Sequence, residues 1–273
     1  MRETVGDATH TIPNGGPTLA YSLHLPSPPS SFSSPSSSSS RPSHADAPIT
    51  RVALIAHPWG SFGGSRDDHV VVALARSLAM EGWAVVRYDA RGAGERSGRA
   101  SWSGEPEADD FRCLVDHVVL PLFSSLASSS SSSQAPAPAK AKKQLLLAGY
   151  SFGALAASSC PPPSDPSIQT SYLLISYPLS VMWALCSFRS SPFSAALKER
   201  VREGKTRVLA VYGDGDQFSA VGKLRGWAEG LKRVEGTEGS STAVEVEGAD
   251  HFWREKEKKK RMLEAVHSWL EEQ

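Results

Sequence analysis

The sequence GYSFG at 149–153 places a serine between two glycines at the junction of two predicted elements. An apolar run at 144–148 directly precedes it, and an Ala/Leu-rich helical pattern at 152–159 follows. In a strand-turn-helix junction of this kind the serine stands above the sheet at a helix N-terminus, where backbone N–H groups can stabilise a developing negative charge. The pattern predicts that Ser151 is a nucleophile. The alternative is a serine that only caps a helix.

A serine hydroxyl is a poor nucleophile near neutral pH and needs a base held in the correct tautomer. His251 follows the predicted strand at 242–246, and the carboxyl ends of parallel strands gather around one crevice. The other histidine after Ser151 is His267, which lies within the helical pattern at the C-terminus. We therefore expect His251 to be the base.

Two acidic residues could orient this base. Asp214 and Asp216 both follow the predicted strand at 207–211, and one of them could serve only to stabilise the turn. Asp250 is a third carboxylate, but neighbouring side chains generally point apart. We favour Asp216 over Asp214 as the acid.

The elements that must position these residues follow an alternating order. Short apolar runs rich in β-branched residues alternate with longer helical patterns, which is typical of a mostly parallel sheet covered on both faces by helices. The expected strands are 18–25, which is antiparallel, and 51–56, 84–88, 144–148, 171–175, 207–211 and 242–246. The expected helices are 68–81, 107–122, 152–159, 195–203, 220–231 and 256–271.

Serine is concentrated in two tracts of this 273-residue chain. Segment 27–43 holds 11 Ser and 4 Pro, and segment 124–139 holds 8 Ser, so neither can bury enough apolar surface to fold by itself. Both fall between predicted elements, and we interpret them as surface insertions in a single α/β domain spanning 1–273.

Composition excludes several classes of protein. Lys+Arg and Asp+Glu are equal at 29, so the chain lacks the basic excess that nucleic-acid binding needs. The N-terminus has no apolar signal region, and no run of 18 apolar residues occurs, which predicts a cytoplasmic protein without a membrane span. The three cysteines are far apart and fit neither a disulfide framework nor a zinc site. We expect no metal and no cofactor.

Several motifs in order resemble one known family. The chain is similar to the α/β-hydrolase superfamily, in particular to its compact group of serine hydrolases with HPHP-like, RGxGxSxG, GxSFGA and GADHF motifs. The matching segments are HPWG at 57–60, YDARGAGERSG at 88–98, GYSFGA at 149–154, GDGDQF at 213–218 and GADHFW at 248–253.

The resemblance implies an α/β-hydrolase fold with Ser151 as nucleophile, Asp216 as acid and His251 as base. It also implies an oxyanion hole formed by the backbone N–H of Phe152 and one from the 57–60 turn, for which we favour Trp59. Trp59 replaces the second histidine of the HPHP motif, and its bulky side chain would either form a wall of the acyl pocket or stack on an aromatic substrate.

The segment at about 177–205 leaves room only for a short lid. Its apolar residues are candidates for contact with substrate, although each of them could equally belong to the core. The expected pocket residues are Trp59, Tyr177, Met182, Trp183 and Trp253.

Four arginines cluster around the predicted strand at 84–88 and the loop after it, namely Arg87, Arg91, Arg96 and Arg99. Guanidinium groups suit carboxylates and phosphates, but acidic neighbours favour internal ion pairs. The segment RGAGERSG lacks the Lys-Ser/Thr ending of a phosphate-binding loop, so nucleotide binding is not expected.

These observations favour a serine hydrolase that cleaves an ester or thioester of a small to medium organic acid, so that the expected partner is a small ester, thioester or lactone. Because fold does not decide reaction, a biosynthetic catalyst of lactone formation, acyl transfer or cyclisation is the first alternative. A non-enzymatic ligand-binding module is the second. The sequence leaves the oligomeric state open.

Overall fold

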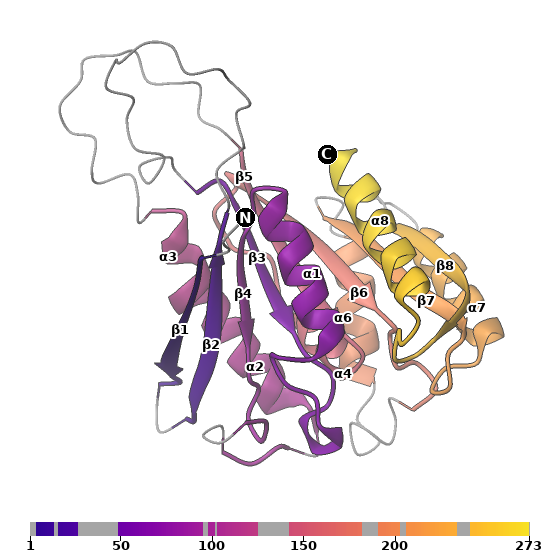
Figure 1. The fold of residues 1–273 in the computed structure, drawn as a ribbon, viewed down its shortest axis with the longest axis horizontal. Coiled ribbons are helices and arrows are strands. Elements are labelled where there is room, and N and C mark those ends of the chain that lie inside the picture. The colour runs from indigo at the N-terminus through magenta and orange to yellow at the C-terminus, as the bar shows by residue number, and fades with distance from the viewer. Residues whose placement is uncertain are drawn as a thin grey trace, which may run out of the picture.

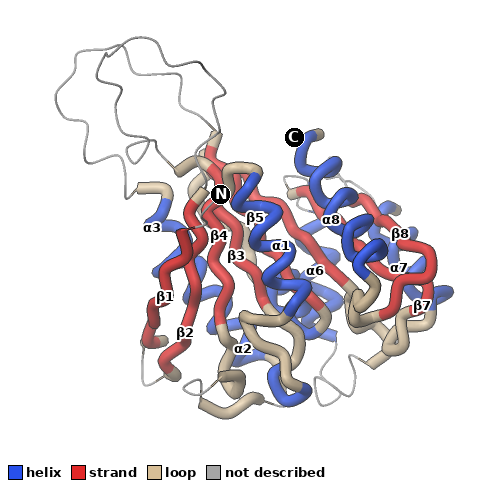
Figure 2. Tube along the Cα trace, in the orientation of Figure 1, coloured by secondary structure: helices blue, strands red, loops and turns tan. Residues whose placement is uncertain are grey.

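The computed structural model describes residues 4–13, 16–26, 49–94, 98–101, 103–124, 142–181, 191–202, 206–233 and 241–272. They form a three-layer arrangement in which helices cover both faces of one eight-stranded sheet (Figure 1). The tube view in Figure 2 shows the strands side by side, with α1 and α8 on the near face. The α/β architecture expected from the sequence is confirmed.

The strand order in the sheet is β1-β2-β4-β3-β5-β6-β7-β8. The strands are β1 Thr4–Thr11, β2 Thr18–Leu25, β3 Arg51–Ala56, β4 Ala84–Tyr88, β5 Lys143–Tyr150, β6 Ile168–Ile175, β7 Arg207–Gly215 and β8 Ser241–Asp250. The helices are α1 His69–Met80, α2 Glu105–Leu114, α3 Leu120–Leu122, α4 Phe152–Ser159, α6 Ser191–Arg202, α7 Val221–Lys232 and α8 Lys256–Glu271.

The register of the strands explains the continuous apolar runs. β1 and β2 form an antiparallel hairpin, β2 pairs antiparallel with β4, and all the remaining pairs are parallel. Along β5, Leu145 and Leu147 enter the core beneath α2, α4 and α6, whereas Leu146 and Ala148 enter the core beneath α1 and α8. A strand with helices on both faces is therefore apolar at every position rather than at alternate ones.

The structure adds one strand to the predicted elements and divides one predicted helix. β1 was not predicted, because its polar sequence at the edge of the sheet carries little hydrophobic signal. The helix expected at 107–122 is divided by a π-helical turn at Val115–Val119, so that α2 ends at Leu114 and α3 is short.

The segment predicted as a lid, about 177–205, contains α6. Its residues Phe193, Leu197 and Val201 are buried in the core shared with α2 and α4, so α6 is a crossover helix and not a cover over a cavity. Residues 182–190 lie outside the described residues. The same holds for segment 27–43 and for all of 124–139 except Ser124.

Candidate active site

Ser151 occupies a strained backbone position between β5 and α4. Its φ of 53° and ψ of −120° are rare for a residue with a side chain. The flanking glycines permit this turn: a Cβ at Gly149 would lie 2.2 Å from the carbonyl oxygen of Gly153, and one at Gly153 would lie 2.5 Å from that of Ala56. The turn is therefore too crowded for larger residues, as expected of a nucleophile elbow.

Three side chains from the ends of three strands meet above the sheet. His251 Nε2 lies 2.9 Å from Ser151 Oγ, and His251 Nδ1 lies 2.6 Å from Asp216 Oδ2. Exposure is 3% for the His251 side chain and 0% for that of Asp216. The short, water-excluded path runs from carboxylate through imidazole to hydroxyl, and it joins the three residues named from the sequence.

The two aspartates at the carboxyl end of β7 have different partners, and Asp214 lies within the strand whereas Asp216 follows it. Asp216 Oδ1 accepts hydrogen bonds from the backbone N–H groups of Phe218 and Ser219 at 2.8 and 2.9 Å, which leaves Oδ2 directed at the histidine. Asp214 Oδ1 accepts from the N–H of Gly248 at 2.6 Å. Asp214 therefore ties the end of β7 to the end of β8, whereas Asp216 contacts the imidazole of His251.

Asp250 also turns away from His251. Its Oδ1 accepts from the backbone N–H of Arg254 at 3.2 Å, and its other carboxylate oxygen lies 3.9 Å from the guanidinium of the same residue.

The backbone of His251 is held by groups that the sequence analysis did not single out. The Tyr150 hydroxyl donates to the His251 carbonyl at 2.8 Å, and the His251 N–H donates to Gln217 Oε1 at 3.0 Å. The Phe218 ring packs edge-on against the imidazole, with centroids 4.6 Å apart. Tyr150 precedes Ser151, and Gln217 and Phe218 follow Asp216 directly. This proximity in the sequence could have indicated that they lie around the same site, because tight loops place adjacent residues close together.

The backbone N–H of Phe152 is one candidate donor to an oxyanion. Phe152 is the first residue of α4, where N–H groups lack intrahelical acceptors and the helix dipole favours negative charge. Gly153 packs closely against the carbonyl groups of Ala56 and His57. A Cβ added to Gly153 would lie 2.5 Å from the Ala56 oxygen and 2.6 Å from the His57 oxygen. This contact brings the start of α4 against the turn that follows β3.

That turn contains Trp59 and is shaped by His57. The N–H of Ala90 donates to His57 Nε2 at 2.9 Å, and His57 Nδ1 lies 2.5 Å from the Pro58 carbonyl oxygen. Both ring nitrogens of His57 are thus engaged, and burial lowers its pKa, so the residue is a neutral structural histidine. The Trp59 ring lies 6.1 Å from that of Phe152.

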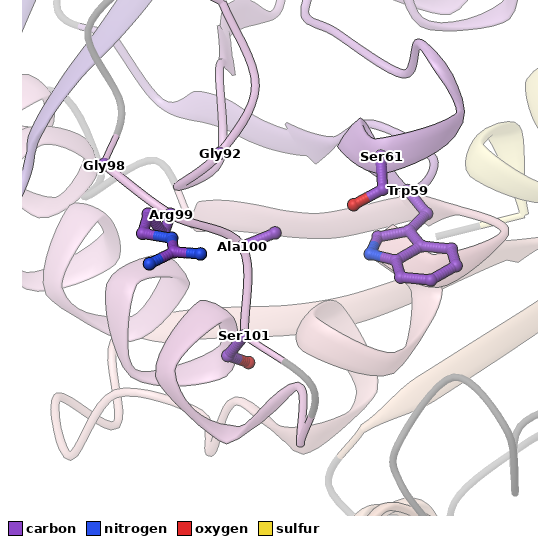
Figure 3. A pocket seen from close by; sticks show the side chains of 7 residues that line it. All are labelled: Trp59, Ser61, Gly92, Gly98, Arg99, Ala100 and Ser101. Carbon is purple, nitrogen blue, oxygen red and sulfur yellow. The ribbon is translucent and has the colours of Figure 1, made fainter.

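The predicted pocket residues have different environments. Trp59 lines a pocket of about 280 Å³ (Figure 3). Tyr177 is buried and stacks on Trp227 with centroids 4.9 Å apart. Met182 and Trp183 lie outside the described residues.

Trp253 does not form a pocket wall, contrary to expectation. Its exposure is 0%, and its indole N–H donates to Ser176 Oγ at 3.0 Å in the core beneath α1 and α8. A backbone φ of 53° reverses the chain directly after the histidine loop. The Trp253 side chain therefore points into the core and away from substrate.

The arginines of β4 and of the loop that follows it also differ. Arg87 donates to His24 Nε2 at 2.7 Å and pairs with Asp67 at 2.6 Å, and Arg91 forms a bidentate pair with Asp110 at 2.6 and 2.7 Å. These are the internal ion pairs favoured by the sequence. Arg96 lies outside the described residues, and Arg99 lines the pocket next to Trp59.

Within the part of the chain that the structure describes, no group of three or more His, Cys, Asp or Glu side chains is arranged to hold a metal ion. In the same residues, no helix is long and apolar enough to cross a bilayer.

Comparisons with known proteins agree on the fold. No protein-family profile matches the chain. An uncharacterized protein of Schizosaccharomyces pombe is 26% identical over 227 residues, covering 82% of this chain and 87% of the relative. Among solved structures, an alpha-beta serine hydrolase homologue from Coxiella burnetii superimposes with a TM-score of 0.65 at 19% identity, covering 96% of this chain and 95% of that one.

A member of the α/β serine hydrolases from Xanthomonas campestris, described as lacking a lid, has a TM-score of 0.63 at 22% identity and covers 96% of this chain and 94% of its own. The chain has the α/β-hydrolase fold. Est1E of Butyrivibrio proteoclasticus, with ferulic acid bound, shares the fold with a TM-score of 0.65 at 14% identity, over 95% of this chain and 96% of that one. The resemblance inferred from the ordered motifs is confirmed at the level of this α/β-hydrolase architecture.

Proposed function

We propose that this α/β-hydrolase-fold protein is a serine hydrolase that cleaves an ester or thioester of a small to medium organic acid. The observation that carries the proposal is the unbroken path from Asp216 Oδ2 to His251 Nδ1, 2.6 Å, and from His251 Nε2 to Ser151 Oγ, 2.9 Å. An ionised carboxylate at Nδ1 keeps the proton on that nitrogen, so that Nε2 is free to accept one. This is the tautomer that general-base catalysis requires.

In the proposed reaction, Ser151 Oγ attacks the substrate carbonyl carbon while its proton passes to His251 Nε2. The tetrahedral intermediate carries a negative charge on the former carbonyl oxygen, which the N–H groups of Phe152 and Trp59 stabilise. His251 then donates its proton to the leaving alcohol or thiol as the carbonyl bond to that group breaks. The product of this half-reaction is an acyl-enzyme on Ser151.

Water completes the cycle. His251 Nε2 takes a proton from the water as its oxygen attacks the acyl carbon, and returns the proton to Ser151 Oγ when the acid leaves. Asp216 stays ionised throughout and stabilises the imidazolium form of His251. The reaction needs no electron carrier and no group-transfer cofactor.

Aromatic side chains around the nucleophile support an organic substrate. Phe218 and Phe252 both pack against the His251 ring, with centroids 4.6 and 5.6 Å away. Phe62 packs edge-on against Trp59 and is 82% exposed. An exposed aromatic rim of this kind favours a ligand with apolar groups.

The proposal is tested by labelling with a fluorophosphonate probe, which forms a covalent bond only with an activated serine. The native protein should be labelled, and Ser151→Ala should lose the label. Ser159→Ala is a matched control, because Ser159 lies on the same helix and its hydroxyl donates only to the Ala156 carbonyl in the described residues. This control should label like the native protein.

The same three proteins should then be assayed with a simple aryl ester. Turnover that survives Ser151→Ala, or a native protein that neither reacts with the probe nor hydrolyses the ester, would show that the nucleophile assignment is wrong.

A further inference from the structure

The turn that follows β3 forms one side of a pocket of about 280 Å³. Figure 3 shows Trp59 and Ser61 on one side of it and Arg99 and Ser101 on the other. Trp59 belongs both to this pocket and to the contact with Phe152, the residue next to Ser151. Trp59 thus links the pocket to the start of α4, and a substrate group that leaves Ser151 along the Trp59 ring would enter the pocket.

The Arg99 side of the pocket belongs to a loop folded back on itself. A Cβ at Gly92, where φ is +80°, would lie 2.3 Å from the backbone nitrogen of Ala100, so the two arms of the loop touch. At its far end, the N–H of Ser101 donates to Glu107 Oε1 at 2.7 Å, and the Ser101 hydroxyl donates to Glu107 Oε2.

The near end of the loop is held in a similar way by Arg91, which forms the bidentate pair with Asp110 of α2. Glu107 and Asp110 have exposures of 3% and 0%, so both clamps are shielded from solvent. Arg91 and Ser101, which lie on either side of Arg99 in the chain, are thus both anchored to α2, and anchored pocket residues reduce the entropy lost when a ligand binds.

Arg99 differs in its pairing from Arg87 of β4 and from Arg91 of the loop that follows. Arg87 and Arg91 are neutralised by Asp67 and Asp110. Arg99 has no acidic side chain paired with it in the described part of the chain, and it supplies the only charge among the residues that line the pocket.

We propose that Arg99 binds a carboxylate carried by the substrate, and that the enzyme prefers esters with such an anionic group over neutral esters of the same length. This proposal rests on the proposed hydrolase function and adds a substrate class to it. A planar guanidinium matches the geometry of a carboxylate, and one positive charge balances one negative charge. The Ser61 hydroxyl on the opposite side of the pocket can donate a further hydrogen bond.

The test measures kcat/KM for two matched substrate pairs, after subtraction of spontaneous hydrolysis. In the first pair the carboxylate is on the acid side: mono-4-nitrophenyl adipate against 4-nitrophenyl hexanoate. In the second it is on the leaving group: 4-acetoxybenzoate against its methyl ester. The ratio of anionic to neutral substrate cancels any general effect of a substitution on the enzyme.

We expect Arg99→Gln to lower this ratio by roughly five- to tenfold for at least one pair, chiefly through KM, because one charge-assisted contact at an accessible site is lost. Arg99→Lys should retain part of the preference, and Arg99→Glu should lower the ratio further. Arg233→Gln is the control. This arginine follows α7, has a 79% exposed side chain and pairs with Glu229, so its removal should leave both ratios unchanged.

The two proposals fail in different ways. If Ser151-dependent turnover is present and neither ratio changes in Arg99→Gln, the carboxylate assignment is wrong while the hydrolase assignment stands. If Arg233→Gln lowers the ratios as much as Arg99→Gln, the effect is one of overall charge, and the assignment is also wrong. If turnover of all four esters is absent or survives Ser151→Ala, the hydrolase assignment fails and the carboxylate proposal fails with it.

Discussion

The hydroxyl of Tyr150 donates a hydrogen bond to the backbone carbonyl of His251 over 2.8 Å, so the residue before Ser151 holds the loop that carries His251. The two residues are 101 positions apart in the chain. Two hydrogen bonds therefore join the turn at Ser151 to His251. One links the Ser151 and His251 side chains, and the other links Tyr150 to the His251 backbone.

Tyr150→Phe should lower both stability and turnover. The substitution keeps the ring but leaves a buried carbonyl without its donor, which costs about 1–3 kcal/mol of unfolding free energy. A displaced imidazole should also reduce kcat/KM by roughly tenfold. Urea unfolding and ester hydrolysis measure the two effects.

Tyr172→Phe is the matched control for this change, because the Tyr172 hydroxyl also donates to a buried carbonyl, that of Cys160, at 2.8 Å. It should cost a similar amount of stability and leave kcat/KM unchanged. An equal loss of activity in both variants would mean that Tyr150 has no positioning role.

Asp216→Asn should reduce kcat by about 10²- to 10⁴-fold and leave the free energy of unfolding nearly unchanged. The amide oxygen can still accept from Phe218 and Ser219, but its NH₂ group now faces His251 Nδ1 and forces the proton onto Nε2. The imidazole can then no longer accept the Ser151 proton. Steady-state kinetics with an aryl ester provide the measurement.

Asp214→Asn serves as the comparison, since the amide oxygen can replace the carboxylate that accepts from the N–H of Gly248. We expect a loss of less than tenfold from this variant, as for one neutral in place of one charged hydrogen bond. A larger loss in Asp214→Asn than in Asp216→Asn would reverse the assignment of the acid.

Gly153→Ala should destabilise the protein by about 1–3 kcal/mol, because the added methyl group would lie 2.5 and 2.6 Å from the carbonyl oxygens of Ala56 and His57. Both obstacles are backbone atoms at the end of β3 and cannot rotate away. Gly226→Ala on α7 meets no atom within 4 Å and should stabilise by about 0.5–1 kcal/mol. Opposite signs in urea unfolding would support this account, and two equal changes would contradict it.

The free energy of unfolding should fall as the pH drops below about 6.5, in part because of His57. Burial lowers the pKa of His57 in the folded protein, so the unfolded chain binds the proton at a higher pH and acid favours unfolding. The Ala90 N–H, which points at Nε2, opposes protonation in the same direction. His57→Gln should be less stable at pH 7.5 but should lose less further stability between pH 7 and pH 5. An identical loss in both proteins would exclude His57 as a source of the acid sensitivity.

The central strands could be predicted almost to the residue. β3 and β4 match the predicted runs at 51–56 and 84–88, because strands buried on both faces carry an uninterrupted apolar signal. β1 could not, because only its pairing with β2 places it in the sheet. β8 extends to Asp250, beyond the predicted 242–246, since backbone pairing continues past the last apolar residue.

Within the site, the positions of Ser151 and His251 followed from the elements around them. Asp216 was favoured over Asp214 from the sequence, but two carboxylates only two positions apart are told apart by their contacts, which are with His251 Nδ1 for Asp216 and with the Gly248 N–H for Asp214. Trp253 was misassigned for a related reason: the direction of its side chain depends on a positive φ that the residue type does not predict.

The parallel sheet has a carboxyl end and an amino end, and the proposed chemistry uses only the carboxyl end. At the carboxyl end, Ser151, Asp216 and His251 follow β5, β7 and β8. At the amino end, β2 ends opposite the start of β4, and β3 and β5 begin. Both serine-rich segments join the domain there, between Leu25 and Arg51 and before Lys143. The amino end of the sheet is thus the natural attachment point for a fluorophore, an affinity tag or a solid support, since the tether would begin a full strand length from the substrate.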